Sequence, residues 1–270
     1  MAARDVVAHD EFDRVLRVAG PREHHDLDDE FRVETDRYLR HAGTVAPPPD
    51  TDTVPGMTLH ATRASYDTVA ADYASLLADE LAAKPLDRAM LGAFAEHVRG
   101  GGFGPVADLG CGPGRVTAHL RDLGLSTFGV DLSPGMVAEA RRRHPELRFE
   151  VGTMTALDLA DGSLGGALVW YSLVHTPPQE LGAYMAEFHR VLAPGGHLLM
   201  AFKAGGDEGV RLEHAYGHSV ELDVYRFAPE RVAGLLEDAG FEVRARLVRA
   251  ADPEERTPQA FLLARRRPMG

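Results

Sequence analysis

Val106-Ala-Asp-Leu-Gly-Cys-Gly-Pro-Gly-Arg115 is the stretch that decides the fold of this chain. Its apolar residues predict a short strand at 105–109, three glycines spaced two apart follow, and a helical pattern begins after them. A second strand is expected at 126–130 and ends on Asp131, about 20 residues after the first glycine. Strand, glycine turn, helix, strand and acid form the first half of a nucleotide-binding α/β unit.

The residue types in this stretch suit a ligand site. Glycine permits positive φ and leaves no Cβ between the backbone and a ligand. The helix that follows presents free N–H groups and the positive end of its dipole. Asp131, at the end of the second strand, is placed to accept hydrogen bonds from both hydroxyls of a ribose.

The glycine spacing differs from that of dinucleotide-binding proteins. Their Gly-x-Gly-x-x-Gly fingerprint needs a third glycine at position 115, where this chain has Arg115, and the third glycine comes one residue earlier, at Gly114. A bulky Arg115 disfavours a pyrophosphate on the start of the helix, and no second nucleotide-binding half follows. A nicotinamide-dependent dehydrogenase is therefore a disfavoured interpretation.

The composition is that of an acidic globular protein. The chain has 29 Lys and Arg against 41 Asp and Glu, a formal net charge of -12 and a pI of about 5.5. Nucleic-acid binders and proteins that dock on anionic membranes usually carry a basic face. We therefore expect neither partner, but a small-molecule substrate and a monomer or homodimer. The 270 residues are enough for one α/β core with an appended helical region.

The number of cysteines and the length of apolar runs indicate the cellular compartment in which the protein is expected. The single cysteine, Cys111, excludes an internal disulfide and is typical of the reducing cytoplasm. No apolar run reaches the ~18 residues of a membrane span, and the polar N-terminal residues do not predict a signal peptide. We expect a cytoplasmic protein. Because the turn needs only a small residue at Cys111, a catalytic thiol there is disfavoured.

Residues 1–60 differ from the rest and predict a helical cap with a linker. Short helices are expected at Asp10–Val18 and Asp28–His41, followed by a proline-rich, extended spacer at 45–56. Histidines at 24 and 25 lie beside carboxylates, but adjacent side chains point in different directions and chelate poorly. We therefore expect no metal site.

The remaining residues alternate between helical and strand patterns. Two amphipathic helices, at 64–81 and 85–98, precede the glycine turn. Alternation of strands and helices implies a parallel sheet covered on both faces, and the last two strands are expected to pair as a hairpin at one sheet edge. The strands are expected near 105–109, 126–130, 147–151, 166–172, 196–202, 241–248 and 259–265, and the later helices near 114–123, 134–143, 180–192 and 229–239.

The pattern Asp-x-Gly-x-Gly-x-Gly at 108–114 resembles motif I of the class I S-adenosylmethionine-dependent methyltransferases. The resemblance extends in motif order over roughly 64–267, through Gly152-Thr-Met-Thr-Ala-Leu-Asp158 and Leu192-Ala-Pro-Gly-Gly196. It implies a Rossmann-like α/β fold with a seven-stranded, mostly parallel sheet, an antiparallel C-terminal strand and helices on both faces. Residues 61–270 would form this domain, with S-adenosylmethionine as the cofactor.

The same resemblance assigns cofactor contacts. Many relatives have an acid directly after Gly152, where this chain has Thr153, so the adenine amine would be held by Thr153 or by backbone. The expected cofactor-binding residues are Tyr66, Asp108, Gly110, Cys111, Gly112, Gly114, Arg115, Asp131, Leu132, Met136, Thr153, Met154, Tyr171 and Ser172.

Ligands of open α/β sheets bind beyond the strand carboxyl ends, which places Tyr171 and His175 at the expected reaction centre. His175 is the first candidate for a general base, because imidazole titrates near pH 6.5; a histidine that caps the following helix or binds a backbone carbonyl is the alternative. An insertion at 204–227 is expected to cover the site, and its His214 and His218 are second-tier catalytic candidates.

These features predict methyl transfer to a small-molecule acceptor, with O- or N-methylation favoured and secondary metabolism as a plausible setting. Two alternatives stay open. The chain would be a protein or peptide methyltransferase if it presents an open acidic groove, or a non-catalytic S-adenosylmethionine-binding protein if no acceptor is ever methylated.

Overall fold

A computed structural model describes residues 55–102, 104–253 and 255–268 of the chain. The helices expected at 10–18 and 28–41 and the histidines at 24 and 25 lie outside the described residues. So does the expected linker up to residue 54.

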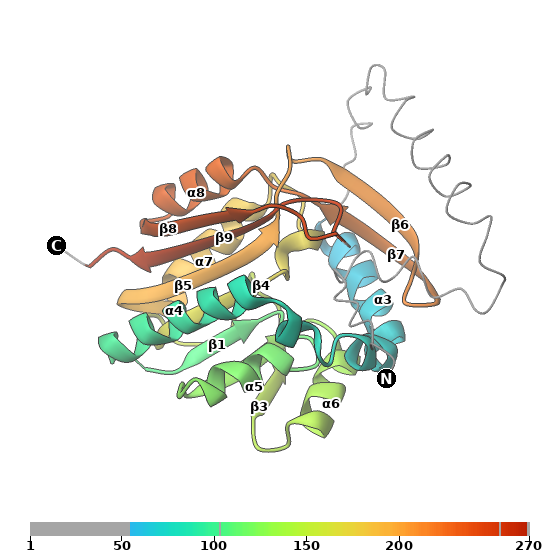
Figure 1. Cartoon of the computed structure of the whole chain (residues 1–270), viewed down its shortest axis with the longest axis horizontal. Coiled ribbons are helices and arrows are strands. Elements are labelled where there is room, and N and C mark those ends of the chain that lie inside the picture. Colours follow the sequence, from blue (N-terminus) through green and yellow to red (C-terminus); the bar gives the residue numbers. More distant parts are fainter. Residues whose placement is uncertain (1–54, 103, 254, 269–270) are drawn as a thin grey trace, which may run out of the picture.

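Seven strands form one sheet in the order β3-β2-β1-β4-β5-β9-β8 (Figure 1). β9 runs antiparallel to both of its neighbours, and the pairs among β1 to β5 are parallel. The predicted seven-stranded sheet is confirmed, as is the terminal hairpin, in which β8 forms the edge and β9 lies inside it. The strands are β1 (Val106–Leu109), β2 (Thr127–Asp131), β3 (Arg148–Val151), β4 (Leu164–Trp170), β5 (Leu192–Lys203), β8 (Phe241–Arg249) and β9 (Gln259–Arg266).

Helices cover both faces of this sheet because β1 and β4 are buried along their whole length and need apolar partners on each side. α4 and α5 pack on one face and α7 and α8 on the other. α6 packs on β3 near the opposite edge. The helices are α4 (Pro85–Gly101), α5 (Arg115–Asp122), α6 (Pro134–Arg143), α7 (Leu181–Val191) and α8 (Pro229–Asp238).

The first described helix, α3 (Pro55–Leu76), begins and ends earlier than the sequence predicted. Pro55 and Gly56, which we had assigned to the linker, are its first residues. Proline suits the first turn of a helix because its missing N–H has no partner there. A short turn and the 3-10 helix η2 (Glu80–Ala83) lead from α3 to α4.

The predicted insertion at 204–227 is a β-hairpin, β6 (Gly209–Ala215) and β7 (His218–Tyr225). Its two-residue turn has positive φ at both residues, 52° at Tyr216 and 80° at Gly217, as hairpin turns of matching twist require. The hairpin packs on α3 and extends beyond the seven-stranded sheet (Figure 1).

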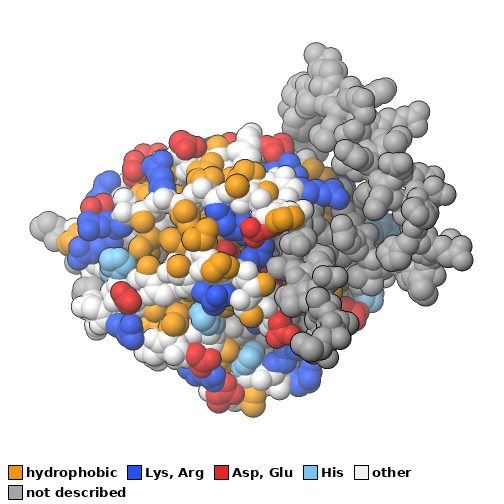
Figure 2. Space-filling model, viewed as in Figure 1, with side chains coloured by type: hydrophobic (Ala, Val, Ile, Leu, Met, Phe, Trp, Pro, Cys, Tyr) orange, Lys and Arg blue, Asp and Glu red, His pale blue; other side chains and the backbone are white. Residues whose placement is uncertain are grey.

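Charged side chains of both signs lie between apolar ones on the face drawn in Figure 2. Among the described residues, no helix is both long enough and apolar enough to cross a membrane.

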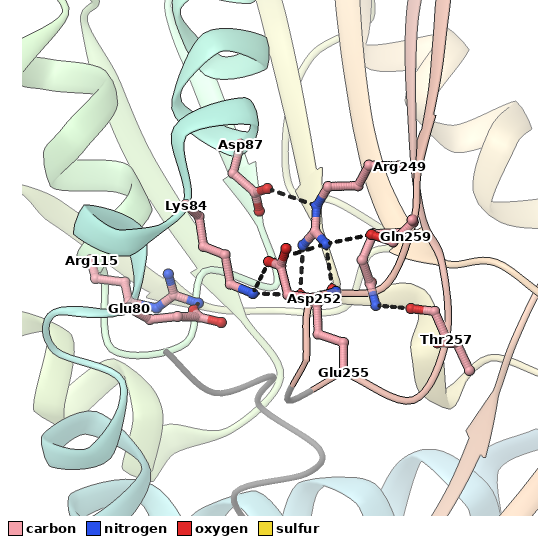
Figure 3. A network of polar contacts seen from close by, with 10 residues as sticks. Glu80, Lys84, Asp87, Arg115, Arg249, Asp252, Glu255, Thr257 and Gln259 are labelled. Carbon is pink, nitrogen blue, oxygen red and sulfur yellow. Dashed lines mark hydrogen bonds and ion pairs between the residues drawn. The ribbon is translucent and has the colours of Figure 1, made fainter. Parts of the chain in front are cut away.

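A cluster of charged side chains joins the start of α4 to the β8–β9 connection (Figure 3). Lys84 Nζ lies 2.5 Å from Glu255 Oε1 and 2.9 Å from Asp252 Oδ2. Arg249 contacts both oxygens of Glu255, and its Nε lies 3.4 Å from Asp87 Oδ1. Only Asp252 of the five is substantially exposed. Because these charges compensate one another, the cluster holds two remote segments together.

Candidate functional site

A cavity opens at the carboxyl ends of β1, β2 and β4, where the strand order reverses. It encloses about 800 Å³ of space, its open mouth included, and α3 closes one side. This is the position at which open α/β sheets bind ligands. The predicted site residues that line it are Tyr66, Gly110, Gly112, Asp131, Leu132, Met136, Thr153, Met154, Tyr171, Ser172 and His175.

The glycine turn takes its shape from close packing. Gly110 has φ 75°, and a Cβ there would overlap the side chain of Ser172. Gly114 has φ 81° at the N-cap of α5, and a Cβ there would lie 2.6 Å from Phe149 Cζ. Neither position admits a side chain. Gly110 lines the cavity, whereas Gly114 packs against β3 and stays outside it.

Asp131 organises the rim of the cavity. Its Oδ2 accepts a hydrogen bond from the Gly112 N–H at 2.8 Å, and its Oδ1 accepts one from the Ser133 N–H at 2.8 Å. Ser133 in turn caps α6 by accepting from the Met136 N–H at 3.0 Å. A carboxylate has about four acceptor sites, so Asp131 holds the turn and retains capacity for two ligand hydroxyls. Burial raises the pKa of Asp131 to about 6 despite these backbone donors.

Asp108 and Cys111 were expected to contact the cofactor, but the structure places both beneath the turn rather than in the cavity lining. The buried Asp108 Oδ2 accepts from Thr117 Oγ1 at 2.6 Å, and burial raises the pKa of this carboxyl to about 6. Cys111 packs against Phe149 and Gly129, and burial raises the pKa of its thiol well above the usual value. A buried thiol that resists ionisation does not act as a nucleophile.

Arg115 also lies outside the cavity. Its Nη2 pairs with Glu80 Oε2 at 2.6 Å, which links α5 to η2 (Figure 3). Arg115 therefore contributes to the packing around the turn rather than to the lining of the cavity.

The imidazole of His175, at the end of η3 (Leu173–His175), is held between two oxygen atoms. Its Nδ1 lies 2.8 Å from the carbonyl oxygen of Asp223 in β7, and its Nε2 lies 2.7 Å from the Tyr66 hydroxyl. A carbonyl only accepts, so Nδ1 carries the proton and Nε2 accepts from the Tyr66 O–H. Burial, helped by the nearby charge of Lys203, lowers the pKa of His175 to about 4. The ring is neutral at pH 7 and has a basic lone pair at Nε2.

The structure does not bring the second-tier histidines into the cavity. His214 is exposed on β6, and His218, the first residue of β7, lies 2.8 Å through Nε2 from Asp72 Oδ2 of α3. Sequence distance alone could not show which residues of this insertion face the cavity. Tyr171, by contrast, lies in the cavity wall with φ 53°. A non-glycine residue in this region costs about 1–3 kcal/mol and is characteristic of functional sites.

Several residues near the site were missed or ranked low from the sequence. Trp170, assigned to the core, is buried and also lines the cavity, as do Thr176 and Tyr184. Asp67 of α3 accepts from Ser133 Oγ at 2.6 Å and from the Gly135 N–H at 2.8 Å, so it supports the cap of α6 from a remote helix. No spacing pattern signals a contact of this kind. In the described part of the chain, no group of three or more His, Cys, Asp or Glu is arranged to hold a metal ion.

The ring state of His175 can be measured by ¹⁵N NMR. We expect the neutral Nδ1–H form at pH 7, with protonation only as the pH approaches about 4. Because this pKa lies below the ~6.5 of an unfolded histidine, the neutral ring's contribution to stability is complete above pH 6.5 and is lost as the pH falls toward 4. His175→Asn identifies the signal by its disappearance. An imidazolium signal at pH 7 would contradict this assignment.

Comparison with known proteins agrees with this geometry. Residues 106–196 match the family model described as a methyltransferase domain. A demethylmenaquinone methyltransferase of Beutenbergia cavernae is 41% identical over 96 residues, which are 36% of this chain and 39% of that protein. A malonyl-[acyl-carrier protein] O-methyltransferase of Enterobacter lignolyticus is 36% identical over 96 residues, 36% of this chain and 38% of that protein. The chain thus spans about two fifths of the length of these relatives.

Among solved structures, the 1,6-didemethyltoxoflavin-N1-methyltransferase of Burkholderia thailandensis, with bound 1,6-didemethyltoxoflavin and S-adenosylhomocysteine, shares the fold. Its TM-score is 0.61 at 22% identity, over 83% of this chain and 93% of that chain. The strand order, the glycine turn and the matched region define a class I S-adenosylmethionine-dependent methyltransferase domain. Residues 106–196 thus carry a methyltransferase domain, and the resemblance noted in the sequence is confirmed.

Proposed function

We propose that this protein transfers the methyl group of S-adenosylmethionine to an oxygen or nitrogen atom of a small molecule in the cytoplasm. The observation that carries the proposal is one cavity lined by the glycine turn, Asp131 and His175. The cavity therefore combines the edge of the sheet that can bind a nucleoside with a proton acceptor, His175 Nε2.

The residues of the cavity fit this cofactor. Asp131 has acceptor capacity for both ribose hydroxyls, and Leu132 and Met136 offer apolar surface to an adenine ring. Gly112 lines the cavity with no Cβ, and a Cβ added there would find only Tyr73 within 4 Å, at 3.8 Å. Backbone amides can therefore approach a ligand closely. When bound, the cofactor supplies an activated methyl group on a sulfonium.

The protein's own task is alignment and exclusion of water. Tyr66 of α3 and Tyr171 after β4 line the cavity together with His175, and the Tyr66 ring lies beside the His175 ring. Holding two reactants in line can lower the activation barrier by about 7–11 kcal/mol. Closure by α3 and the hairpin favours a small acceptor group over a folded protein segment.

Calorimetric titration with S-adenosylhomocysteine tests the proposal. We expect binding at one site, weakened about ten- to a hundredfold in Asp131→Ala, because a charge-assisted hydrogen bond contributes about 1.5–3 kcal/mol. Asp238→Ala, at the exposed end of α8, is the matched control and should bind as the parent does.

A parallel titration with NADH separates the cofactor classes. No binding of S-adenosylhomocysteine, or binding of NADH in its place, would exclude the proposed function. Binding without methyl transfer to any acceptor would identify a non-catalytic cofactor-binding protein.

A further inference from the structure

A second cavity lies beneath the β6–β7 hairpin and adjoins the first. It encloses about 380 Å³, its mouth included. The two cavities share Tyr66, Tyr171 and His175, so these three side chains form the wall between them. A group bound in the second cavity reaches the cofactor cavity only at this wall.

The second cavity is mostly apolar. Its remaining lining comes from Val174, Lys203, Leu212, Ala215, Tyr216, Leu222 and Val224. Apart from the phenol oxygens, its polar side-chain groups are the imidazole of His175 and the ammonium of Lys203, which is 6% exposed. Such walls favour a ligand with an apolar body and a small polar group directed toward His175.

The Tyr66 hydroxyl occupies the hydrogen-bonding position at His175 Nε2. The Asp223 carbonyl orients the ring from the other side, so Nε2 remains an acceptor whichever O–H group lies opposite. A second O–H group that enters this cavity can take the place of the Tyr66 hydroxyl without any change in the His175 tautomer.

We propose that the cavity beneath the hairpin binds the methyl acceptor, and that this acceptor is a mostly apolar molecule whose acidic hydroxyl, a phenol or enol, replaces the Tyr66 hydroxyl at His175 Nε2. This inference rests on the proposed function and adds the place and chemical class of its acceptor.

The oriented base favours an acidic hydroxyl over an amine. A neutral amine reacts through its own lone pair and needs no proton acceptor at His175, whereas a phenol or enol loses its proton, which the oriented Nε2 can accept. His175, with its pKa lowered to about 4, is a weak base that suits an acidic hydroxyl better than an aliphatic alcohol.

The step balances within the site. The acceptor's O–H proton passes to His175 Nε2 while an oxygen lone pair forms the new bond to the methyl carbon. The carbon–sulfur bond breaks, and its electron pair stays on sulfur as the thioether. The imidazolium then releases its proton to solvent.

Binding of three probes with one scaffold tests the class of acceptor. With S-adenosylhomocysteine present, we expect 2-naphthol to bind at least tenfold more tightly than 2-naphthylamine or 2-naphthalenemethanol. The near-ultraviolet spectrum of bound 2-naphthol, which shifts on ionisation, reports its proton transfer independently of turnover. Preference for the amine or the aliphatic alcohol, or no binding of 2-naphthol, overturns the proposal. Because S-adenosylhomocysteine binding is measured first, its loss would count against the proposed function instead.

Filling the second cavity tests the location. Leu212→Trp is expected to abolish 2-naphthol binding and leave S-adenosylhomocysteine binding unchanged, since Leu212 lines only the second cavity. Val210→Trp, on the same strand but 47% exposed and outside the lining, is the matched control. Equal binding of 2-naphthol by the parent and Leu212→Trp would place the acceptor elsewhere.

Two further variants separate the roles of Tyr66 and His175. His175→Asn keeps a donor for the Asp223 carbonyl but removes Nε2, and should lower the rate of 2-naphthol methylation by about 10²–10⁴-fold. Tyr66→Phe removes the competing hydroxyl, and should tighten 2-naphthol binding without a comparable loss of rate. A large loss of rate in Tyr66→Phe with no effect of His175→Asn would overturn the assignment of the base.

Discussion

Glu255→Gln is expected to lower the free energy of unfolding by about 3–5 kcal/mol, because it removes the buried carboxylate that two buried cations share. Lys84 then keeps only the half-exposed Asp252, and Arg249 keeps only carboxylate partners 3.4 Å away. Glu255 is 3% exposed and contacts Lys84 and Arg249, which are 4% and 8% exposed. Neither cation can turn to bulk water without opening the junction between α4 and the β8–β9 connection (Figure 3). The amide keeps the shape of the carboxylate but not its charge.

Denaturant unfolding measures this change, and an exposed pair provides the control. Glu242 and Arg244 lie 2.8 Å apart on β8, about half exposed, so Glu242→Gln should change stability by no more than about 0.5 kcal/mol. Equal effects of the two variants would show that the cluster does not stabilise the junction.

The same carboxylate makes stability depend on pH. Burial opposes its ionisation, but hydrogen bonds from Arg249 and Lys84 outweigh burial and lower the pKa of Glu255 to about 2. Its contribution is therefore present above the unfolded pKa of ~4.3 and is lost as the pH falls toward 2. In Glu255→Gln, this acid-dependent part of the stability curve should be missing.

Gly110→Ala is expected to lower the free energy of unfolding by roughly 2–5 kcal/mol and to weaken S-adenosylhomocysteine binding. Alanine at φ 75° costs about 1–2 kcal/mol. The added Cβ also overlaps the side chain of Ser172, and overpacking costs about 1–3 kcal/mol more. Relief requires the glycine turn to move away from β4, which displaces the backbone that lines the cavity.

Thermal unfolding and calorimetric titration of one preparation measure both effects. Gly92→Ala is the matched control, because Gly92 lies inside α4 with open space around it and without positive φ. Alanine favours a helix interior by about 1 kcal/mol over glycine, so this variant should be slightly stabilised and bind normally. A Gly110→Ala protein as stable as its parent would contradict the packing described here.

The sequence was sufficient to predict the sheet because its signals are local. Alternating apolar segments, glycine turns and proline starts depend on neighbouring residues, and the strands and later helices lie within a few residues of the predicted ranges. The start of α3 was misplaced because a proline-rich stretch can end an extended spacer or begin a helix, and both are compatible with the same residues.

The site was predictable to the extent that it depends on backbone position. Strand ends and the glycine turn placed Asp131, Ser172 and His175 at one edge of the sheet, and all three line the cavity. His214 and His218 have the same side-chain chemistry but do not line the cavity, because the register and twist of the hairpin decide which of its residues face it.

By itself, the sequence determined the α/β fold and the nucleoside-binding edge, since both follow from short-range spacing, and it carried the resemblance to methyltransferase domains at 106–196. Only the tertiary structure decided which distant groups meet. It pairs Tyr66 and Asp223 with His175, Asp67 with Ser133, and Lys84 with Glu255. Such contacts join residues far apart in the chain, and they exist only where packing of the whole domain buries them together and excludes the water that would otherwise satisfy them.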